Sequence, residues 1–364
     1  MDASRSDAQH MRRALRLAAR GRGRVSPNPM VGAVIVDDAG QIVGEGYHHE
    51  IGGPHAEAHA LLAAGDRARG ATLYCTLEPC TVDGRTPPCA SAVVAAGIRR
   101  LVCALPDPDE RVSGCGFQLV REAGIQVEVG TGGDAAQELL GAYLHHRRTG
   151  RALMTLKLGQ TLDGRIATRD GDSRWITGDA ARRHAHRWRS WVDGIMVGAG
   201  TVLTDDPALT VRHVRGRDPR PVVVDGRLRC DPSARVFAGS NPVLVIGASS
   251  PPADRQRFVD GGVDVWTCPD EDGVVDLRQV AARCGAAGMT QVIVEGGRTL
   301  AAAALAGGAI DEVMIYLAPR FLGGDAIAAV GNLGIDRLET TPRLSGVRTK
   351  RLGEDILLTG KVVD

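Results

Sequence analysis

The strongest constraint on the fold is an alternation of short β-type apolar runs with helical runs rich in small residues, which occurs in two successive blocks. The first block spans residues 30–145 and the second begins near residue 153. The basic, turn-prone run 145–151 lies between them and is predicted to be a linker. Such alternation favours α/β domains in which strands separated by a helix pair in parallel. A chain of 364 residues has room for two domains, and we expect them to cover 1–147 and 151–364.

The first block is predicted to begin with a helix and a hairpin. Met11, Leu15 and Ala18 form one helical stripe in the Arg-rich segment 11–24, and two alternating runs at 31–36 and 41–46 flank a turn. The rest of the block predicts strands at 71–77, 99–104 and 125–129. Helices are predicted at 55–64, from residue 89 to before Gly97, between 104 and 125, and at 135–146.

The second block predicts a larger sheet. The apolar runs favour strands at 153–158, 194–197, 221–224, 242–246, 263–267, 292–295 and 312–317. Helices are predicted after Thr177 and after Gly297. The sequence 293–300 therefore reads as a strand, a double glycine and a helix, which would let backbone N–H groups meet a phosphate. The same pattern is also common in plain turns, so both interpretations stay open.

A set of potential metal ligands lies in the first block. His55 and Glu57 form a His-x-Glu motif after Pro54, and Pro79-Cys80 is followed by Cys89. This combination is typical of zinc deaminases that act on nucleobases. One imidazole and two thiolates leave a fourth zinc position for water, whose pKa the metal lowers to about 7. We therefore predict one Zn²⁺ per chain, bound by His55, Cys80 and Cys89, with Glu57 as the catalytic proton shuttle.

Helix starts are predicted to bring these side chains together. Residues two apart on a helix point about 200° from each other, so His55 and Glu57 can share a metal site only at the first turn. Pro54 marks such a start, and Pro88 precedes Cys89 in the same way, where the helix dipole favours a thiolate. The remaining cysteines of this block fit no ligand spacing and are predicted to be structural: Cys75, Cys103 and Cys115.

Charge and composition argue against several classes of protein. Lys and Arg (44) nearly balance Asp and Glu (43), and the net charge of +1 disfavours nucleic-acid wrapping. No apolar run approaches the ~18 residues of a membrane span, and no secretory segment is evident. Cytosolic thiols are the default for the eight cysteines. We expect a cytoplasmic protein with no nucleic-acid or membrane partner.

The first block closely resembles the deaminase domain of the bacterial bifunctional riboflavin-biosynthesis enzymes. The resemblance rests on the zinc motif, the GRTPPC loop at 84–89, and the segments 26–32 and 44–48. It implies a cytidine-deaminase-like three-layer α/β/α domain. Asn28, between two prolines in a segment predicted to be extended, suits binding of a pyrimidine edge, and its alternative is a turn residue. This chain has Thr81-Val82 where the family usually has Ser-His.

The second block resembles the reductase domain of the same enzymes, in the segments 157–159, 162–165, 173–177, 200–207 and 209–212. This resemblance implies a dihydrofolate-reductase-like α/β fold that uses NADPH to reduce a ribosylamino group. The implied cofactor-binding residues are Gly159, Trp175, Thr201, Asp205, Gly297, Arg298, Thr299, Leu300, Ala301, Ala302 and Ala303. The implied substrate-binding residues are Ser173, Arg189, Leu209, Arg212 and Glu295, together with Asn28 in the first domain.

The leading prediction is a bifunctional, homo-oligomeric enzyme of riboflavin biosynthesis that acts on small phosphoribosylaminopyrimidines. It would deaminate the diamino-hydroxypyrimidine and then reduce the ribosylamino-uracil with NADPH. One alternative is a nucleic-acid-editing zinc deaminase with an appended binding domain, which would need stacking aromatics, whereas aromatic residues are only 3% of the chain. A second half that binds nucleotides without catalysis is the other alternative.

Overall fold

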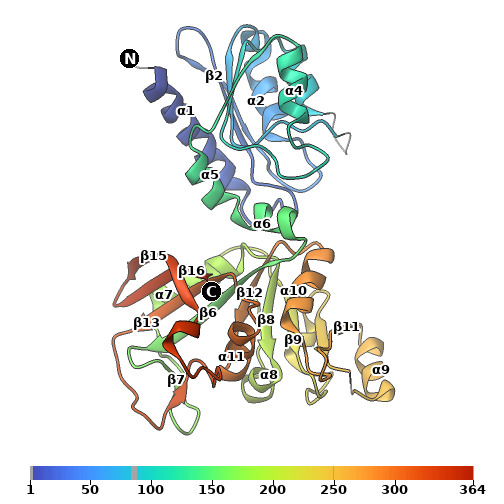
Figure 1. Ribbon diagram of the computed structural model, residues 1–364, viewed down its shortest axis with the longest axis vertical. Helices are drawn as coiled ribbons and strands as arrows, with labels where there is room; N and C mark the ends of the chain where they lie inside the picture. The colour runs from blue at the N-terminus through green and yellow to red at the C-terminus, as the bar shows by residue number, and fades with distance from the viewer. Residues whose placement is uncertain (1–2, 83–87, 249, 364) are drawn as a thin grey trace. The chain divides into compact units, whose positions relative to one another are not determined.

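The computed structural model describes residues 3–82, 88–248 and 250–363, which form two compact units, Met1–Gly150 and Arg151–Asp364 (Figure 1). The run 145–151, predicted to be a linker, is largely helical instead. Helix α6 (Gly141–Thr149) continues through it, and Gly150, with a left-handed φ of 70°, ends the helix. Residues 84–87 of the GRTPPC loop lie outside the described residues.

The first unit is built on a sheet of strand order β2-β1-β3-β4-β5. β1 (Gly32–Val36) and β2 (Ile42–Tyr47) form the predicted antiparallel hairpin. β3 (Thr72–Cys75), β4 (Arg100–Cys103) and β5 (Gln126–Val129) pair in parallel, as predicted for strands that a helix separates.

Helices cover both faces of this sheet, so the predicted three-layer arrangement is confirmed. α2 (Ala56–Ala64), α3 (Cys89–Ala95) and α4 (Cys115–Glu122) pack on one face. α1 (Ala3–Ala18), α5 (Gly133–Leu139) and α6 pack on the other. β1 supplies both cores, because Ala33 and Ile35 face one layer and Val34 and Val36 the other. The single helix predicted at 135–146 is two helices, because Leu140 leaves the helical conformation while its side chain stays buried.

Two glycines in β2 let α2 lie unusually close to the sheet. A Cβ on Gly44 would come within 2.2 Å of the Ala60 carbonyl oxygen, and one on Gly46 within 2.3 Å of that of Ala56. Any larger residue would push the helix outward. The glycines therefore set the depth of the first turn of α2, which carries the predicted His-x-Glu motif.

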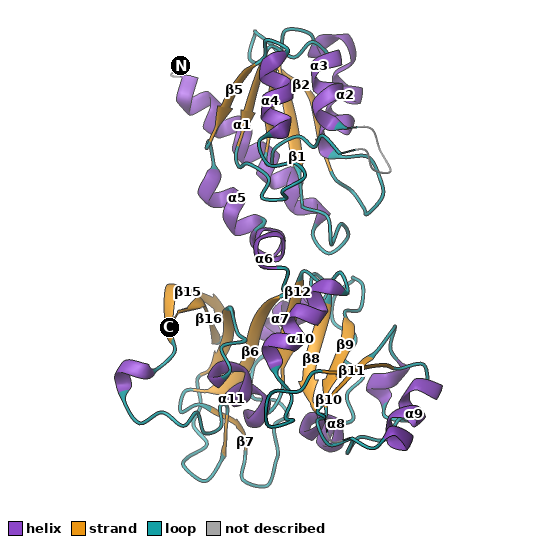
Figure 2. Cartoon of the chain, turned by 45° about the vertical axis from the view of Figure 1, so that its right-hand side comes forward, coloured by secondary structure: helices purple, strands orange, loops and turns teal. Residues whose placement is uncertain are grey.

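The second unit is built on a larger sheet of order β11-β10-β9-β8-β12-β6-β13-β16-β15 (Figure 2). Pairing is parallel from β11 through to β13 and antiparallel for β16 and β15. The strand bounds are β6 (Leu153–Thr161), β8 (Gly194–Gly198), β9 (Arg220–Val224), β10 (Val243–Ile246), β11 (Asp264–Thr267), β12 (Gln291–Glu295), β13 (Glu312–Ala318), β15 (Arg343–Leu352) and β16 (Asp355–Val363). β7 (Arg165–Ala167) pairs separately with β14 (Ile327–Ala328).

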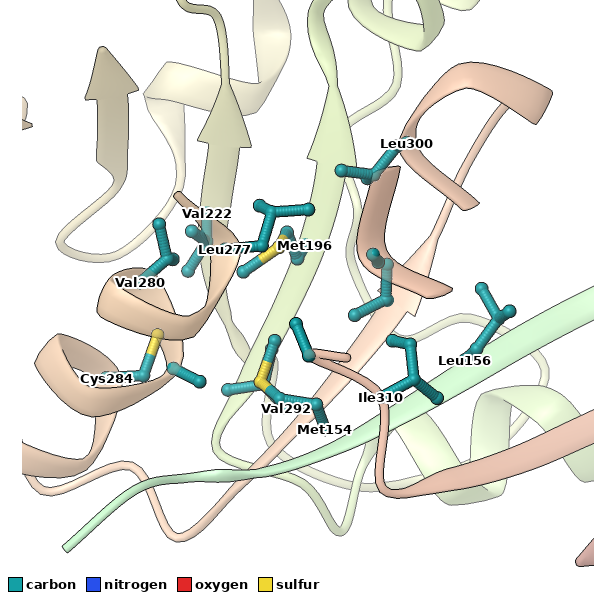
Figure 3. Packing of buried hydrophobic residues seen from close by; sticks show 14 of the residues in the cluster. Met154, Leu156, Met196, Val222, Leu277, Val280, Cys284, Val292, Leu300 and Ile310 are labelled. Atoms are coloured by element: carbon teal, nitrogen blue, oxygen red, sulfur yellow. The ribbon is translucent and has the colours of Figure 1, made fainter. Parts of the chain in front are cut away.

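The helices of the second unit also divide between two faces. α10 (Leu277–Ala286) and α11 (Arg298–Ala306) pack on one core, where Leu277, Val280 and Leu300 meet strand residues such as Met196 (Figure 3). α8 (Ala199–Asp205) and α9 (Pro252–Asp260) pack on the opposite face. α7 (Asp179–Arg189) covers the β13 and β16 end of the sheet. Among the helices described, none combines the length and apolar character of a membrane span.

Candidate active sites

Three side chains of ligand type converge in the first unit. His55 is the N-cap of α2, Cys89 is the first residue of α3, and Cys80 lies in the loop before α3. Their ligand atoms all lie within 4.8 Å of one another. Nδ1 of His55 is 3.5 Å from Sγ of Cys80 and 3.3 Å from Sγ of Cys89. One nitrogen and one sulfur at the starts of two helices, with a second sulfur from the loop before α3, fit a single zinc ion with one position left open.

The electrostatics of this cluster favour a thiolate. A hydrogen bond from the Cys89 thiol, with help from His55, lowers the pKa of Cys80 to about 4. The Cys89 backbone N–H also points at Sγ of Cys80, at 3.5 Å. Two other cysteines of the unit, Cys75 and Cys103, are buried and burial raises the pKa of each. Cys80 therefore differs in acidity from these two cysteines, whereas the hydrogen bond to Cys80, together with burial, raises the pKa of Cys89.

Glu57 lies beside the cluster in the first turn of α2, with only 3% of its surface exposed. Burial raises the pKa of Glu57, and the nearby Cys80 sulfur adds to the effect. Glu57 therefore holds a proton more firmly than a surface glutamate does. The helix start places it next to the ligands, as the spacing of the motif predicted.

Asn28 contacts His48 at the edge of the same site. Nδ1 of His48 lies 3.1 Å from the carbonyl oxygen of Pro54, so Nδ1 carries the hydrogen and Nε2 is an acceptor. The side-chain amide of Asn28 donates to that Nε2 at 3.2 Å, which turns Oδ1 of Asn28 away from His48. The segment is not extended as predicted: Asn28 closes a turn by donating its backbone N–H to Val25.

Glu78 braces the loop that precedes Cys80. Its buried carboxylate accepts backbone N–H groups from Asp107 at 3.2 Å, Gly114 at 3.1 Å and Phe117 at 3.1 Å. Three bonds from one carboxylate fix residues 107–117 against the Pro79-Cys80 segment.

The second unit has a topological switch point between β8 and β12. These strands are parallel neighbours, yet the helices that follow them, α8 and α11, pack on opposite faces of the sheet. In open α/β sheets, ligands bind in the crevice that forms outside the carboxyl ends of such strands. Figure 1 shows α8 and α11 at the same end of the sheet.

Glycines and a threonine line this crevice. Gly198 is the N-cap of α8 and Gly297 the N-cap of α11. Gly296 has a φ of 154°, and a Cβ there would come within 3.3 Å of Oγ1 of Thr201 and 3.6 Å of the Gly198 nitrogen. A crevice that a single Cβ would narrow, at the N-terminus of the nine-residue helix α11, fits the pyrophosphate of a dinucleotide. Of the predicted cofactor residues, the structure brings Thr201 and Gly297 together here.

A charged cluster lies next to this crevice. Glu295 ends β12 and is paired in register with Lys157 of β6, whose Nζ lies 3.4 Å from Glu295 Oε2. Nη2 of Arg189, from α7, lies 3.2 and 3.0 Å from the two carboxylate oxygens. Burial alone would raise the pKa of Glu295, but Arg189 and Lys157 outweigh it and hold this pKa at about 2. Glu295 is therefore an anion at any physiological pH.

Helix α7 also anchors the loop 209–212. Nη1 of Arg189 donates to the carbonyl oxygen of Thr210 at 2.8 Å, and the backbone N–H of Arg212 donates to Nδ1 of His186 at 3.0 Å. Burial lowers the pKa of His186 to about 4, which keeps Nδ1 available as an acceptor. The predicted substrate residues Arg189, Arg212 and Glu295 thus belong to one connected region.

Other predicted residues occupy different surroundings. Leu300 and Ala301 point into the core, and Leu209 is likewise buried, so these side chains pack against protein. Trp175 is 59% exposed, with the Arg182 guanidinium 4.6 Å from its ring centroid. Asp205 follows Thr201 by one helical turn and lies 4.0 Å from Arg174. Ala302 is buried as well. The remaining predicted residues are exposed or half-buried: Gly159, Ser173, Arg298, Thr299 and Ala303.

Sequence reasoning missed four residues of these sites: His48, Glu78, Lys157 and His186. Lys157 lies in the segment 157–159 that carried the resemblance, but no site role was predicted for it. His48 stands in the segment 44–48 that carried the resemblance, but nothing in one sequence shows that it contacts Asn28. Glu78 directly precedes the Pro-Cys motif, and that position was the only available signal. His186 lies one helical turn before Ser190 on an Arg-rich helix and gave no signal at all.

Comparison with known proteins agrees with both sites. Residues 4–105 match the family model "Cytidine and deoxycytidylate deaminase zinc-binding region", and residues 152–358 match "RibD C-terminal domain". The riboflavin biosynthesis protein RibD of Escherichia coli is 39% identical over 97% of this chain and 98% of its own length. The RibD protein of Mycobacterium tuberculosis is 38% identical over 93% of this chain and 92% of its own length.

Solved structures give the same result over the whole chain. Acinetobacter baumannii RibD superposes with a TM-score of 0.90 at 36% identity, covering 99% of this chain and 100% of that one. A Thermotoga maritima diaminohydroxyphosphoribosylaminopyrimidine deaminase/5-amino-6-(5-phosphoribosylamino)uracil reductase gives 0.85 at 31% identity, with coverage of 99% and 100%.

Fold and sites together define a bifunctional enzyme, a zinc-dependent deaminase joined to a reductase with a dihydrofolate-reductase-like fold. The chain belongs to the RibD family of riboflavin biosynthesis proteins. Zn²⁺ and NADPH are the cofactors that this assignment carries, and a nucleic-acid-editing deaminase is not favoured by matches that extend over both domains.

Proposed function

We propose that the unit Met1–Gly150 carries the deaminase and Arg151–Asp364 the reductase. In the deaminase, His55, Cys80 and Cys89 would hold one zinc ion, which would lower the pKa of a bound water so that hydroxide is available at neutral pH. The observation that carries this proposal is the convergence of those three ligand atoms within 4.8 Å.

Glu57 would move the protons of the deamination. Its buried position in the first turn of α2 places the carboxylate beside the ligands without making it one of them. A carboxylate there can take a proton from water and deliver it to the ring nitrogen. It can then take the second proton from the hydroxyl group added to the ring carbon and deliver it to the amino group, which leaves as ammonia.

Asn28 would orient the pyrimidine ring. His48 accepts a hydrogen bond from the Asn28 amide, which leaves Oδ1 of Asn28 to accept one from the ring edge. His48 is a positioning residue in this proposal, because it acts through Asn28. Val82 takes no part, and we propose no contact in its place.

In the reductase, NADPH would lie across the switch point and supply a hydride. Gly297 and Thr201 would meet the pyrophosphate at the N-terminus of α11, and the exposed ring of Trp175 would offer a flat apolar surface. The cofactor site would be completed by Gly159, Asp205 and the residues 298–303. The buried residues among them, 300–302, would contribute backbone groups and not side chains.

The sugar substrate would bind on the α7 face of the sheet. Ser173, Arg189, Leu209, Arg212 and Glu295 are the residues that we propose for it, and arginine forks suit a ribose phosphate. Reduction adds hydride at the anomeric carbon and a proton at the ring oxygen. Lys157, held beside Glu295 at 3.4 Å, can donate that proton.

We further propose that the enzyme acts on small phosphoribosylaminopyrimidines in the cytoplasm, as a homo-oligomer. A reducing compartment would keep Cys80 and Cys89 available as thiolates. Light scattering of the purified full-length chain tests the assembly.

The experiment that tests the two activities is an incubation of the pyrimidine substrate with and without NADPH, followed by mass spectrometry. We expect loss of one amino group without NADPH, and a further gain of two hydrogens with it. Recovery of unchanged substrate in both incubations would refute the proposal.

A further inference from the structure

Four neighbouring strands of the second unit end in glycine at the same edge of the sheet. The order β10-β9-β8-β12 is parallel throughout, so their carboxyl ends lie side by side. The glycines at or just after these ends are Gly247, Gly226, Gly198 and Gly296. A Cβ on Gly247 would come within 2.4 Å of the Gly273 carbonyl oxygen, so the edge is covered at β10. At Gly226 the nearest such contact is Cγ2 of Val275 at 3.4 Å, so the room for a ligand beyond the crevice lies over the ends of β8 and β9.

The direction of the proposed dinucleotide along this edge follows from the position of the charged cluster. Lys157 and Glu295 lie on β6 and β12, on one side of the crevice. The hydride-donating end of NADPH must lie beside the substrate, hence on this side. With the pyrophosphate at the crevice, the adenosine half extends the other way, over the ends of β8 and β9.

The turn that follows β9 lies at that position. Gly198 pairs in register with Val224, so residues 225–228 come directly beside the start of α8. The Leu228 backbone N–H donates to the carbonyl oxygen of Asp225 at 3.1 Å, which makes Gly226 and Arg227 the central residues of a tight turn.

Arg227 and Arg229 are the exposed residues of this turn. Within the described part of the chain, Arg227 has no hydrogen bond or ion pair. Arg229 lies 3.6 Å from Asp225, an ion-pair contact longer than a hydrogen bond. A guanidinium at the tip of a turn, without a protein partner, is suited to a phosphate.

An exposed aspartate at position 225 would favour NADH instead of NADPH. Sites for NAD use an acidic residue to bind the ribose 2′-OH, whereas an arginine accommodates the 2′-phosphate of NADP. Here the Asp225 side chain is 0% exposed, and its Oδ2 accepts the Cys230 backbone N–H at 2.7 Å. The carboxylate is turned inward, and the turn presents positive charge to the ligand edge.

We propose that Arg227, with Arg229 beside it, binds the 2′-phosphate of NADPH and makes the reductase select NADPH over NADH. The inference rests on the proposed reductase function and adds the specificity determinant to it.

The test uses the full-length protein and two small probes, 2′,5′-ADP and 5′-AMP, which differ only by the 2′-phosphate. Calorimetry should show that Arg227→Ala weakens 2′,5′-ADP binding by about tenfold to a hundredfold, the range for hydrogen bonds to a charged group. Binding of 5′-AMP should stay unchanged. Arg227→Lys should retain part of the affinity, because a point charge replaces the fork.

Arg351→Ala is the matched control, an exposed arginine on β15 at the far edge of the sheet. It should leave both affinities at the parent values. In the Arg227→Ala/Arg229→Ala variant, KM for NADPH should rise towards that for NADH, while deamination continues as an internal check of folding.

Two results would overturn the proposal, and they differ. If the parent protein prefers 2′,5′-ADP and the double variant keeps that preference, the inference fails and the reductase function stands. If the parent protein binds neither probe and mass spectrometry shows no reduced product, the proposed function fails and this inference falls with it.

Discussion

Arg189 of α7 and Glu295 of β12 form an ion pair of 3.0 Å in which both side chains are largely buried. The same guanidinium donates to the Thr210 carbonyl oxygen at 2.8 Å. One arginine thus connects a helix, the end of a central strand and the loop 209–212. Because Lys157 reaches the same carboxylate, a strand of the sheet is part of this network as well.

Removal of Arg189 should be strongly destabilising. Arg189→Met would leave the Glu295 charge buried with only the longer contact to Lys157, and breaking a buried pair from one side costs about 3 kcal/mol. Urea unfolding followed by tryptophan fluorescence should report the lost stability. Three of the tryptophans lie in α7 or just before or after it. Arg212→Met, at an exposed arginine of the same region, should change stability by less than about 1 kcal/mol.

The pair also predicts a pH dependence with a definite sign. The pKa of Glu295 is about 2 in the folded chain, against an ordinary value of 4.5. The contribution of this carboxylate is therefore complete above about pH 4.5 and is lost as the pH falls towards 2. The urea midpoint of the parent protein should fall more steeply over this window than that of Glu295→Gln. Parallel curves would contradict the assignment.

The zinc site predicts different behaviour for cysteines of the same domain. Cys80→Ser and Cys89→Ser should each lose the ion in metal analysis of the purified protein, because two ligands hold Zn²⁺ far more weakly than three. Cys115→Ser is the matched control, an exposed cysteine at the start of α4. Full zinc content in Cys80→Ser would show that the ligand set is wrong.

Local patterns were sufficient for most of the fold. The apolar run 31–36 gives a buried strand because its residues face packed cores on both sides of the sheet, and in the run 292–295 the three apolar residues 292–294 are fully buried. The strands β15 and β16 and the helices α8, α9 and α10 were not predicted. β15 is almost wholly exposed, so its polar run 343–352 lacks the burial that makes a strand visible in sequence. The pairing of β16 with β13, and of β15 with β16, is a tertiary effect.

The zinc ligands could be predicted because chemistry restricts which residues bind zinc. The surroundings of each site depend instead on contacts between distant segments, such as His48 with Asn28 or Arg189 with Glu295. No site was predicted at the turn 225–228. Only the register of β8 against β9 shows that this turn lies beside the start of α8. Side-chain direction likewise decided that Leu209 and Leu300 pack inward.

His48 should affect substrate binding more than turnover. His48→Ala would free the Asn28 amide to rotate, so the pyrimidine would bind less firmly. Because the His48 ring also packs edge-on against the His55 ring, with 5.2 Å between the ring centroids, unchanged zinc content must accompany this effect. KM for deamination should rise severalfold with a smaller change in kcat. His49→Ala is the control, since this exposed ring stacks on His59 and does not reach Asn28. Equal effects of both variants would argue against a positioning role.

The two activities should be separable by single substitutions. Glu57→Gln keeps the shape of the buried side chain but removes the carboxyl group that accepts and donates protons, so deamination should fall by about 10²–10⁴-fold while zinc content stays unchanged. Given the deaminated pyrimidine, this variant should consume NADPH at the parent rate, because the proposed reductase residues all lie beyond residue 150.

Gly297→Asp should do the reverse, since it places a carboxylate at the N-terminus of α11, where we propose that the pyrophosphate binds. NADPH oxidation should stop, while ammonia release continues and the ribosylamino product accumulates. Both rates should be followed in the same preparations, by ammonia release and by absorbance of NADPH. Loss of both activities in Glu57→Gln, with zinc and fold intact, would mean that the chemistry is not divided between the two units.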